Sequence, residues 1–212
     1  MRATMQAALG AALSTGLMFS AAPAAAAELL VGLYGHDVTF IGEAIGSGAA
    51  GREGGVDLHL GVRSAPIEAL WGDPQAHAFV SLNSENTSNF VAAGLSWPIA
   101  LTERIYVRPG LGLAYTDGEA GLPPVNAPGL TPQETARRLE LYNTRIDFGS
   151  NLLFEPELSI GYRFSERLAA ELSWVHISNA QIFHQGKNQG LDDAGVRLIY
   201  SFCPAAAPAK AS

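Results

Sequence analysis

Three side chains near the C-terminal end of the chain could together cleave an ester. His176 and Ser178 stand two apart in Trp-Val-His-Ile-Ser-Asn (174–179), and Asp192 closes Asn-Gln-Gly-Leu-Asp (188–192). Imidazole, hydroxyl and carboxylate are the groups of a serine hydrolase. Because side chains alternate along a strand, His176 and Ser178 project the same way, and we expect their tips within hydrogen-bond reach. Trp174 shares their parity, so the pair continues an apolar face, which indicates chemistry at a lipid surface.

The ends of the chain indicate export. Arg2 is followed by an apolar stretch through Phe19 and then by an alanine-rich Ala-x-Ala pattern that ends at Ala27. This is typical of a cleaved secretory signal, so we expect the mature protein to begin near Glu28. Residues 28–202 then form one domain, and the Ala/Pro-rich residues 203–212 are expected to be a disordered tail. The single cysteine, Cys203, cannot form an internal disulfide.

The charge and hydropathy patterns limit the partners. The net charge of −7 argues against nucleic acid as a simple electrostatic partner. No run of about eighteen apolar residues follows the leader, which excludes a membrane-spanning helix but leaves a membrane-spanning barrel open. The sequence leaves the oligomeric state open, a homodimer included.

Short segments of alternating polar and apolar residues predict an all-β fold. We expect eight strands, an even number that suits a closed antiparallel transmembrane β-barrel. The connections on one side are long, at 39–55, 118–148 and 179–193, although 86–87 is short. Those on the other side are mostly short, as in bacterial outer-membrane barrels. The expected strands cover 28–38, 56–66, 76–85, 88–101, 104–117, 149–164, 167–178 and 194–202.

The face assignments predict a polar interior. One face of each strand is apolar, as with Leu158 and Ile160, and the other carries charges. Four acids and four arginines share that polar face, so we expect a salt-bridged plug that fills a narrow lumen. His59 and His77 are interpreted as satisfied interior groups. The charged set is Asp57, Glu155, Glu157 and Glu171 with Arg63, Arg108, Arg163 and Arg197.

Alternation alone does not separate a membrane barrel from a water-soluble sandwich or lipocalin-like barrel, which points its apolar face inward. The leader, the loop asymmetry and the aromatic residues near strand ends, such as Trp97 and Tyr115, favour the membrane barrel.

The segment 176–180 (His-Ile-Ser-Asn-Ala), followed by Asn188-x-Gly190-x-Asp192 and by 195–197 (Gly-Val-Arg), resembles the outer-membrane lipid A 3-O-deacylase family. The match is dense over 170–202, and the opening 32–38 is also similar. The resemblance implies a small barrel with an esterase site on its lipid-facing wall, near the external leaflet. It also implies hydrolysis of the acyl chain ester-linked at the 3-position of lipid A, with lipopolysaccharide as the substrate.

In the mechanism we expect, Ser178 attacks the ester, His176 transfers the proton and Asp192 orients the imidazole. The side chains of Asn179 and Asn188 and the backbone amides around Ala180 and Gly190 are the candidate oxyanion donors. Members of the family carry Glu at the third position, and Asp193 remains the alternative acid in this chain.

No cofactor and no metal site are expected, because no histidines and acids share ligand-like spacing along the chain. Residues 131–139 could form a short helix with a Thr cap and Pro at its first position, which would present Arg137 and Arg138 to lipid phosphates. Two other hypotheses remain open, a non-catalytic outer-membrane barrel such as an adhesin or structural protein and a secreted lipid-binding barrel.

Overall fold

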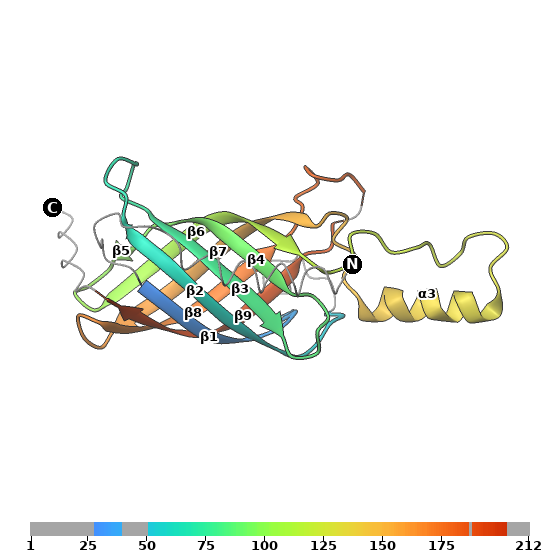
Figure 1. Cartoon of the computed structure of the whole chain (residues 1–212), viewed down its shortest axis with the longest axis horizontal. Coiled ribbons are helices and arrows are strands. Elements are labelled where there is room, and N and C mark those ends of the chain that lie inside the picture. Colours follow the sequence, from blue (N-terminus) through green and yellow to red (C-terminus); the bar gives the residue numbers. More distant parts are fainter. Residues whose placement is uncertain (1–27, 40–50, 187, 203–212) are drawn as a thin grey trace.

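A computed structural model describes residues 28–39, 51–186 and 188–202. It shows a closed antiparallel barrel, and a long loop that contains a helix projects from one end of it (Figure 1). The strand order runs from β4 through β3, β2, β1, β9, β8 and β7 to β6, and pairing of β4 with β6 closes the circle. The elements are β1 (Glu28–Gly35), β2 (Val56–Pro66), β3 (Gln75–Asn83), β4 (Phe90–Ser96), β5 (Ile99–Ala100), β6 (Ile105–Thr116), α3 (Pro132–Thr144), β7 (Leu152–Arg163), β8 (Leu168–Ile177) and β9 (Leu191–Ser201).

The predicted fold class is therefore confirmed, with eight long strands near the expected positions. One expected strand, 88–101, is divided into β4 and the two-residue β5. Pro98 has no N–H to donate to a ladder, so pairing is interrupted there. The expected leader and the expected tail lie outside the described residues, as does most of the loop 39–55.

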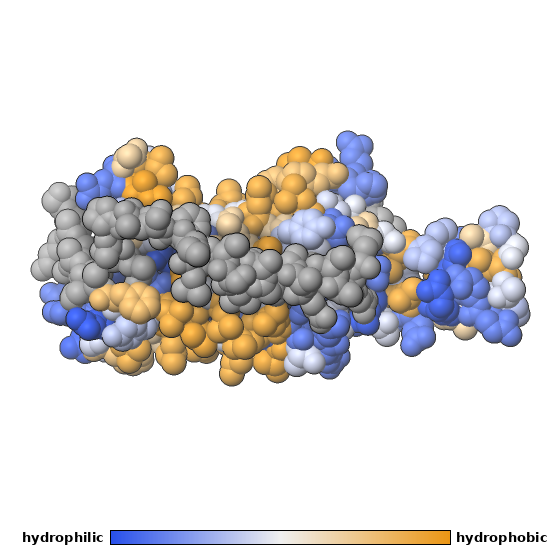
Figure 2. Space-filling view, viewed as in Figure 1, coloured by the Kyte–Doolittle hydropathy of each residue, from blue (hydrophilic) through white to orange (hydrophobic). Residues whose placement is uncertain are grey.

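The orientation of the side chains is that of a membrane barrel. Aliphatic side chains point outward along the strands and remain exposed, such as Leu172 at 62%. On the face shown in Figure 2, hydrophobic residues gather over the barrel, above and below the atoms drawn in grey. A water-soluble barrel would bury these residues instead. No helix among the described residues is long and apolar enough to cross a membrane.

Charged side chains fill the interior. Glu171 accepts hydrogen bonds from three arginines: Arg63 at 3.0 and 3.2 Å, Arg108 at 3.1 Å and Arg197 at 2.6 Å. Arg197 also binds Glu157, at 2.9 Å. All five side chains are buried. The predicted plug is present and makes the lumen a packed core.

The expected pairing of four acids with four arginines is wrong in detail. Asp57 contacts His36 at 2.9 Å, and Glu155 contacts His77 at 3.1 Å. Arg163 lies over the ring of Tyr106, 4.4 Å from its centroid. Parity gives the face of a side chain but not its height along the barrel, so it could not determine which charges meet.

The predicted helix is confirmed and is longer than expected. Thr131 caps α3 by accepting a hydrogen bond from Glu134 N at 3.2 Å, and Pro132 opens the first turn. Arg137 and Arg138 both bind Glu134. The helix buries no residue and extends beyond the barrel (Figure 1).

Candidate active site

The β8–β9 ladder brings together two of the three predicted catalytic side chains. His176 pairs with Asp192 across the ladder, so their side chains stand side by side on the outer wall. His176 Nδ1 lies 2.9 Å from Asp192 Oδ1. Both side chains are partly exposed, at 27% and 21%. A contact between Nδ1 and a carboxylate leaves Nε2 of the ring available for proton transfer.

Ser178 lies one residue beyond the end of β8. Its backbone N–H donates to Phe154 O at 3.1 Å, and its carbonyl accepts from Phe154 N at 2.7 Å. Among the described residues, no hydrogen bond joins the Ser178 hydroxyl to His176, although parity placed them in reach. The β8–β9 ladder ends at Ile177, so strand geometry no longer dictates where Ser178 projects. A serine hydroxyl turns about a single bond, and catalytic hydrogen bonds often tighten only when substrate binds.

Two aromatic residues lie near Ser178. Phe154 is paired with Ser178, and the ring of Phe183 stacks on Phe154 with centroids 4.8 Å apart. Ser178 itself is 9% exposed. The nucleophile candidate thus lies beside aromatic side chains at the rim of the lipid-facing wall.

The turn that follows Ser178 is strained. Ala180 and Gln181 both have positive φ, 52° and 61°, a region that residues with a Cβ adopt at a cost of about 1–3 kcal/mol each. The side chain of Asn179 holds this turn, since its Oδ1 accepts from Gln181 N at 2.7 Å and its Nδ2 donates to Phe148 O at 2.5 Å. Asn179 is buried and its carboxamide is occupied, so it supports the turn rather than facing substrate.

Two other candidate donors lie at the same turn. Within the described chain, the backbone N–H of Ala180 has no hydrogen-bond partner. Asn188 Oδ1 accepts from Asn179 N at 2.9 Å, which fixes the carboxamide of Asn188 next to the same turn. These N–H groups are available to an oxyanion, whereas the carboxamide of Asn179 is not.

The hydrogen bond between Trp174 and Asp192 was not predicted from the sequence. The indole Nε1 of Trp174 donates to Asp192 Oδ1 at 2.7 Å, so this oxygen faces both the indole and the imidazole of His176. Trp174, His176 and Asp192 lie on one outward face, and alternation along β8 had placed Trp174 there. The hydrogen bond itself depends on the register of β8 against β9, which the sequence does not reveal.

The remaining acids near the site face inward. Asp193 is buried in the lumen, where its Oδ2 lies 3.3 Å from His59 Nε2. Glu171 is buried among the arginines. Of the acids weighed for the third position, the structure places Asp192 against His176.

Gly190 gives His176 its space. A Cβ on Gly190 would lie 2.4 Å from Cε1 and 3.0 Å from Nε2 of His176, closer than real Cβ contacts allow. The glycine is therefore needed for close approach to the imidazole rather than for an unusual backbone angle.

We expect Gly190→Ala to lower ester hydrolysis at this candidate site about 100-fold, because a ring displaced by about 1 Å loses catalytic alignment. The urea midpoint of unfolding should stay near that of the wild type. Gly121→Ala is the matched control, since a Cβ at Gly121 would meet nothing within 4 Å. Equal activity of the two variants would contradict this role of Gly190.

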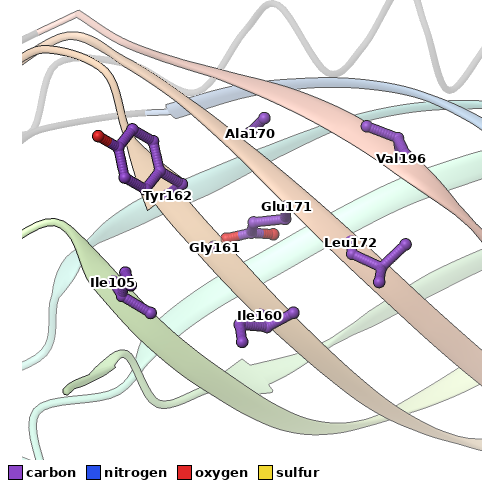
Figure 3. Close-up of a pocket in the computed structure, with 8 residues that line it drawn as sticks. All are labelled: Ile105, Ile160, Gly161, Tyr162, Ala170, Glu171, Leu172 and Val196. Carbon is purple, nitrogen blue, oxygen red and sulfur yellow. The ribbon is translucent and has the colours of Figure 1, made fainter.

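A depression of about 320 Å³ lies on the barrel wall where β6, β7, β8 and β9 are neighbours (Figure 3). It forms where the small Ala170 stands among larger side chains. Ala170 precedes His176 by six residues, or about 20 Å along a strand. The depression is too distant to hold the scissile bond. Its lining residues are Ile105, Ile160, Gly161, Tyr162, Ala170, Glu171, Leu172 and Val196.

Comparison with known proteins identifies the family. The sequence model described as Lipid A 3-O-deacylase (PagL) matches residues 65–201, more than half of the chain. Among curated proteins, none matches the sequence. Among solved structures, the crystal structure of the outer membrane enzyme PagL is similar at 14% identity and a TM-score of 0.49, over 83% of this chain and 99% of that one. The crystal structure of Neisserial surface protein A is similar at 8% identity and a TM-score of 0.47, over 84% and 97%.

The family match includes β8, β9 and all residues of the candidate site. The barrel, with its apolar wall and charged core, fits an enzyme of the Gram-negative outer membrane. The chain belongs to the lipid A 3-O-deacylase (PagL) family of outer-membrane hydrolases.

Proposed function

We propose that this protein is a serine esterase that hydrolyses the 3-O-linked acyl chain of lipid A with Ser178, His176 and Asp192. The observation that carries the proposal is the contact of 2.9 Å between His176 and Asp192 on the lipid-facing wall, two residues before Ser178. An ester of lipid A lies where acyl chains meet headgroups, and the end of an outward-running strand lies at the same level.

In this mechanism the Ser178 hydroxyl forms a bond to the ester carbonyl carbon while its proton passes to His176 Nε2. Collapse of the tetrahedral intermediate breaks the ester bond, and the 3-oxygen of the sugar leaves with the proton held on His176. Asp192 orients the ring through Nδ1 and stabilises its cation. The acyl chain is then hydrolysed from Ser178.

The developing oxyanion needs donors that are in place before reaction. Ala180 N–H and the carboxamide of Asn188 fit this role best, with the backbone amide of Gly190 as a third candidate. Asn179 acts through the turn, since its own carboxamide binds Phe148 and Gln181.

Mass spectrometry of lipid A tests this function. The refolded barrel, in detergent micelles with lipopolysaccharide, should release one 3-hydroxy fatty acid and leave lipid A lighter by that acyl chain. Loss of a chain from another position would refute the assigned bond. Unchanged lipid A would favour a non-catalytic barrel instead.

We also expect Trp174 to act as a positioning residue for Asp192. Trp174→Phe keeps a ring but removes one hydrogen bond to a carboxylate, worth about 1.5–3 kcal/mol. The kcat should fall about 10-fold to 100-fold, with KM nearly unchanged, because substrate contacts remain. Steady-state kinetics would measure both.

Trp97→Phe is the matched control for Trp174→Phe. Trp97 also donates an indole hydrogen bond, to Trp71 O at 3.1 Å, but on the opposite rim of the barrel. Similar kcat values for the two variants would show that the hydrogen bond to Asp192 is not used in catalysis.

A further inference from the structure

A second cluster of polar side chains lies inside the barrel, behind the candidate active site. We define it as the luminal cluster of His36, Asp57 and Asp193. His36 follows β1, Asp57 is near the start of β2 and Asp193 is near the start of β9, and these three strands are neighbours. His36 Nδ1 lies 2.9 Å from Asp57 Oδ2 and 3.6 Å from Asp193 Oδ1. All three side chains are buried.

Each member of the luminal cluster is oriented by a further partner. Metal-binding sites are built this way, because a ligating histidine usually donates its other N–H to a carboxylate and ligating carboxylates are themselves hydrogen-bonded. The partners are Glu53 for His36 Nε2 at 3.2 Å, Ser81 and Asn83 for Asp57, each at 2.8 Å, and His59 for Asp193 Oδ2 at 3.3 Å.

One carboxylate oxygen of the luminal cluster, Asp193 Oδ1, lacks a short hydrogen bond. This oxygen is buried and, within the described part of the chain, has no donor at a short hydrogen-bond distance. The only other described groups within reach of the Asp193 carboxyl are His36, His59, the Asp57 carboxyl and the backbone N–H of Asp37, so a proton held between Asp57 and Asp193 is the alternative to a bound ion. Asp193 Oδ1 points at the space next to His36 Nδ1. A buried carboxylate oxygen without a short hydrogen bond is costly, so a group that it could bind is expected there.

The charge around His36 is also unbalanced. Three carboxylates surround it, those of Glu53, Asp57 and Asp193. The arginines deeper in the lumen bind Glu157 and Glu171 instead. A divalent cation would offset this negative charge where a single imidazole does not.

We propose that the luminal cluster binds a divalent metal ion of the zinc class through His36 Nδ1 and one oxygen each of Asp57 and Asp193. Zinc takes nitrogen and carboxylate ligands at about 2.0–2.2 Å, so tetrahedral ligand atoms stand about 3.4 Å apart. The two distances from His36 Nδ1, 2.9 and 3.6 Å, bracket that spacing. An imidazole ligand disfavours calcium and magnesium, which prefer oxygen.

Protons are the competing way to offset the charge. Burial disfavours the imidazolium of His36, but hydrogen bonds to Asp57 and Glu53 outweigh it and raise the pKa of His36 to about 10. A protonated cluster would not retain zinc, so the two alternatives give opposite results in a binding experiment.

A bound ion would tie β1, β2 and β9 together at the outer end of the barrel. Asp193 is adjacent to Asp192, and Val38 N donates to the carbonyl of Asp192 at 2.8 Å. The ion would therefore stiffen the segment that carries the proposed triad acid. The metal proposal does not rest on the proposed esterase function, and its test reads metal binding directly.

The experiment uses the mature chain without a histidine tag, refolded into detergent micelles with or without zinc and then dialysed. Because the cluster is buried, zinc is also added to the folded barrel. We expect about one tightly held zinc ion per chain by mass spectrometry of the metal content, and at least tenfold weaker zinc affinity for Asp193→Asn. Wild-type protein that holds no zinc after either treatment would overturn the proposal.

His77→Gln is the matched control variant. His77 is also buried between two carboxylates, but Glu155 contacts its Nε2 at 3.1 Å and Glu157 lies 3.8 Å from its Nδ1. Ligands on opposite sides of the ring cannot chelate one ion, so His77→Gln should keep its zinc. Zinc lost equally from His77→Gln and Asp193→Asn, or retained by Asp193→Asn, would place the ion elsewhere and refute the site.

Folding of each variant is checked by its heat-modifiable migration in gels. If Asp193→Asn does not fold, X-ray absorption of the wild-type protein decides the question. We expect a first shell of nitrogen and oxygen with the scattering pattern of one imidazole, and a shell with several imidazoles or with sulfur would exclude the cluster.

Discussion

Ser178→Ala is expected to lower the rate of acyl-chain release from lipid A by at least about 1,000-fold while the barrel still folds. In the proposed mechanism the Ser178 hydroxyl is the nucleophile, so its removal leaves only the weak effect of the oxyanion donors and of substrate binding. His176→Ala should cause a similar loss, because serine is a poor nucleophile unless a base accepts its proton. The release of 3-hydroxy fatty acid over time gives both rates.

The double variant Ser178→Ala, His176→Ala tests whether the two side chains act as one catalytic unit. Residues that act as one unit are not additive, so the double variant should be no slower than either single variant. Losses that multiply would show that the two side chains act separately.

Ser173→Ala is the matched control for the nucleophile. Ser173 lies on the same strand, but on the inner face, where it hydrogen-bonds Ser159 at 3.0 Å. The same chemical change there should leave the rate within about twofold, because no reacting atom is near. If Ser178→Ala still deacylates lipid A, the serine mechanism is refuted, although the protein remains a deacylase.

Glu171→Gln is expected to have the largest effect on stability. Glu171 accepts from Arg63, Arg108 and Arg197 and from the hydroxyl of Tyr106, so its neutralisation leaves three buried guanidinium groups without their shared anion. Breaking a buried pair of this kind costs about 3–5 kcal/mol. Urea unfolding in micelles, followed by tryptophan fluorescence, should show the loss.

Glu134→Gln makes the same chemical change outside the barrel. Glu134 also binds two arginines, Arg137 and Arg138, but on the exposed helix α3. Exposed ion pairs are screened by solvent and contribute little to folding stability, so the urea midpoint should barely move. If Glu171→Gln unfolds at the same urea concentration as Glu134→Gln, the charged lumen does not hold the barrel together.

Alternation in the sequence was sufficient to predict the fold because a barrel wall has only two faces. Leu158 and Ile160 on the outside and Glu157 and Ser159 on the inside follow from parity alone. Parity does not give height, however, and so it could not show that Asp57 meets His36 or that Glu155 meets His77.

The candidate site was predictable to the same extent. His176, Ser178 and Asp192 were recognised by residue type and spacing, but the contact of Trp174 with Asp192 depends on the β8–β9 register. The luminal cluster was missed for a similar reason. His36 and Asp57 are 21 positions apart in the sequence, and Asp57 and Asp193 are 136 positions apart. Only barrel closure brings the three residues together.

The packed lumen has a consequence for the second half of the reaction. Glu171, Arg63 and their partners are buried and fill the interior between the described strands. In the proposed mechanism, the water that releases the acyl group from Ser178 would therefore arrive over the rim, where His176 is partly exposed. A serine esterase immersed in hydrocarbon would thus depend for each turnover on the hydration of the cell surface, and crowding of the headgroups above the site would slow the release of product.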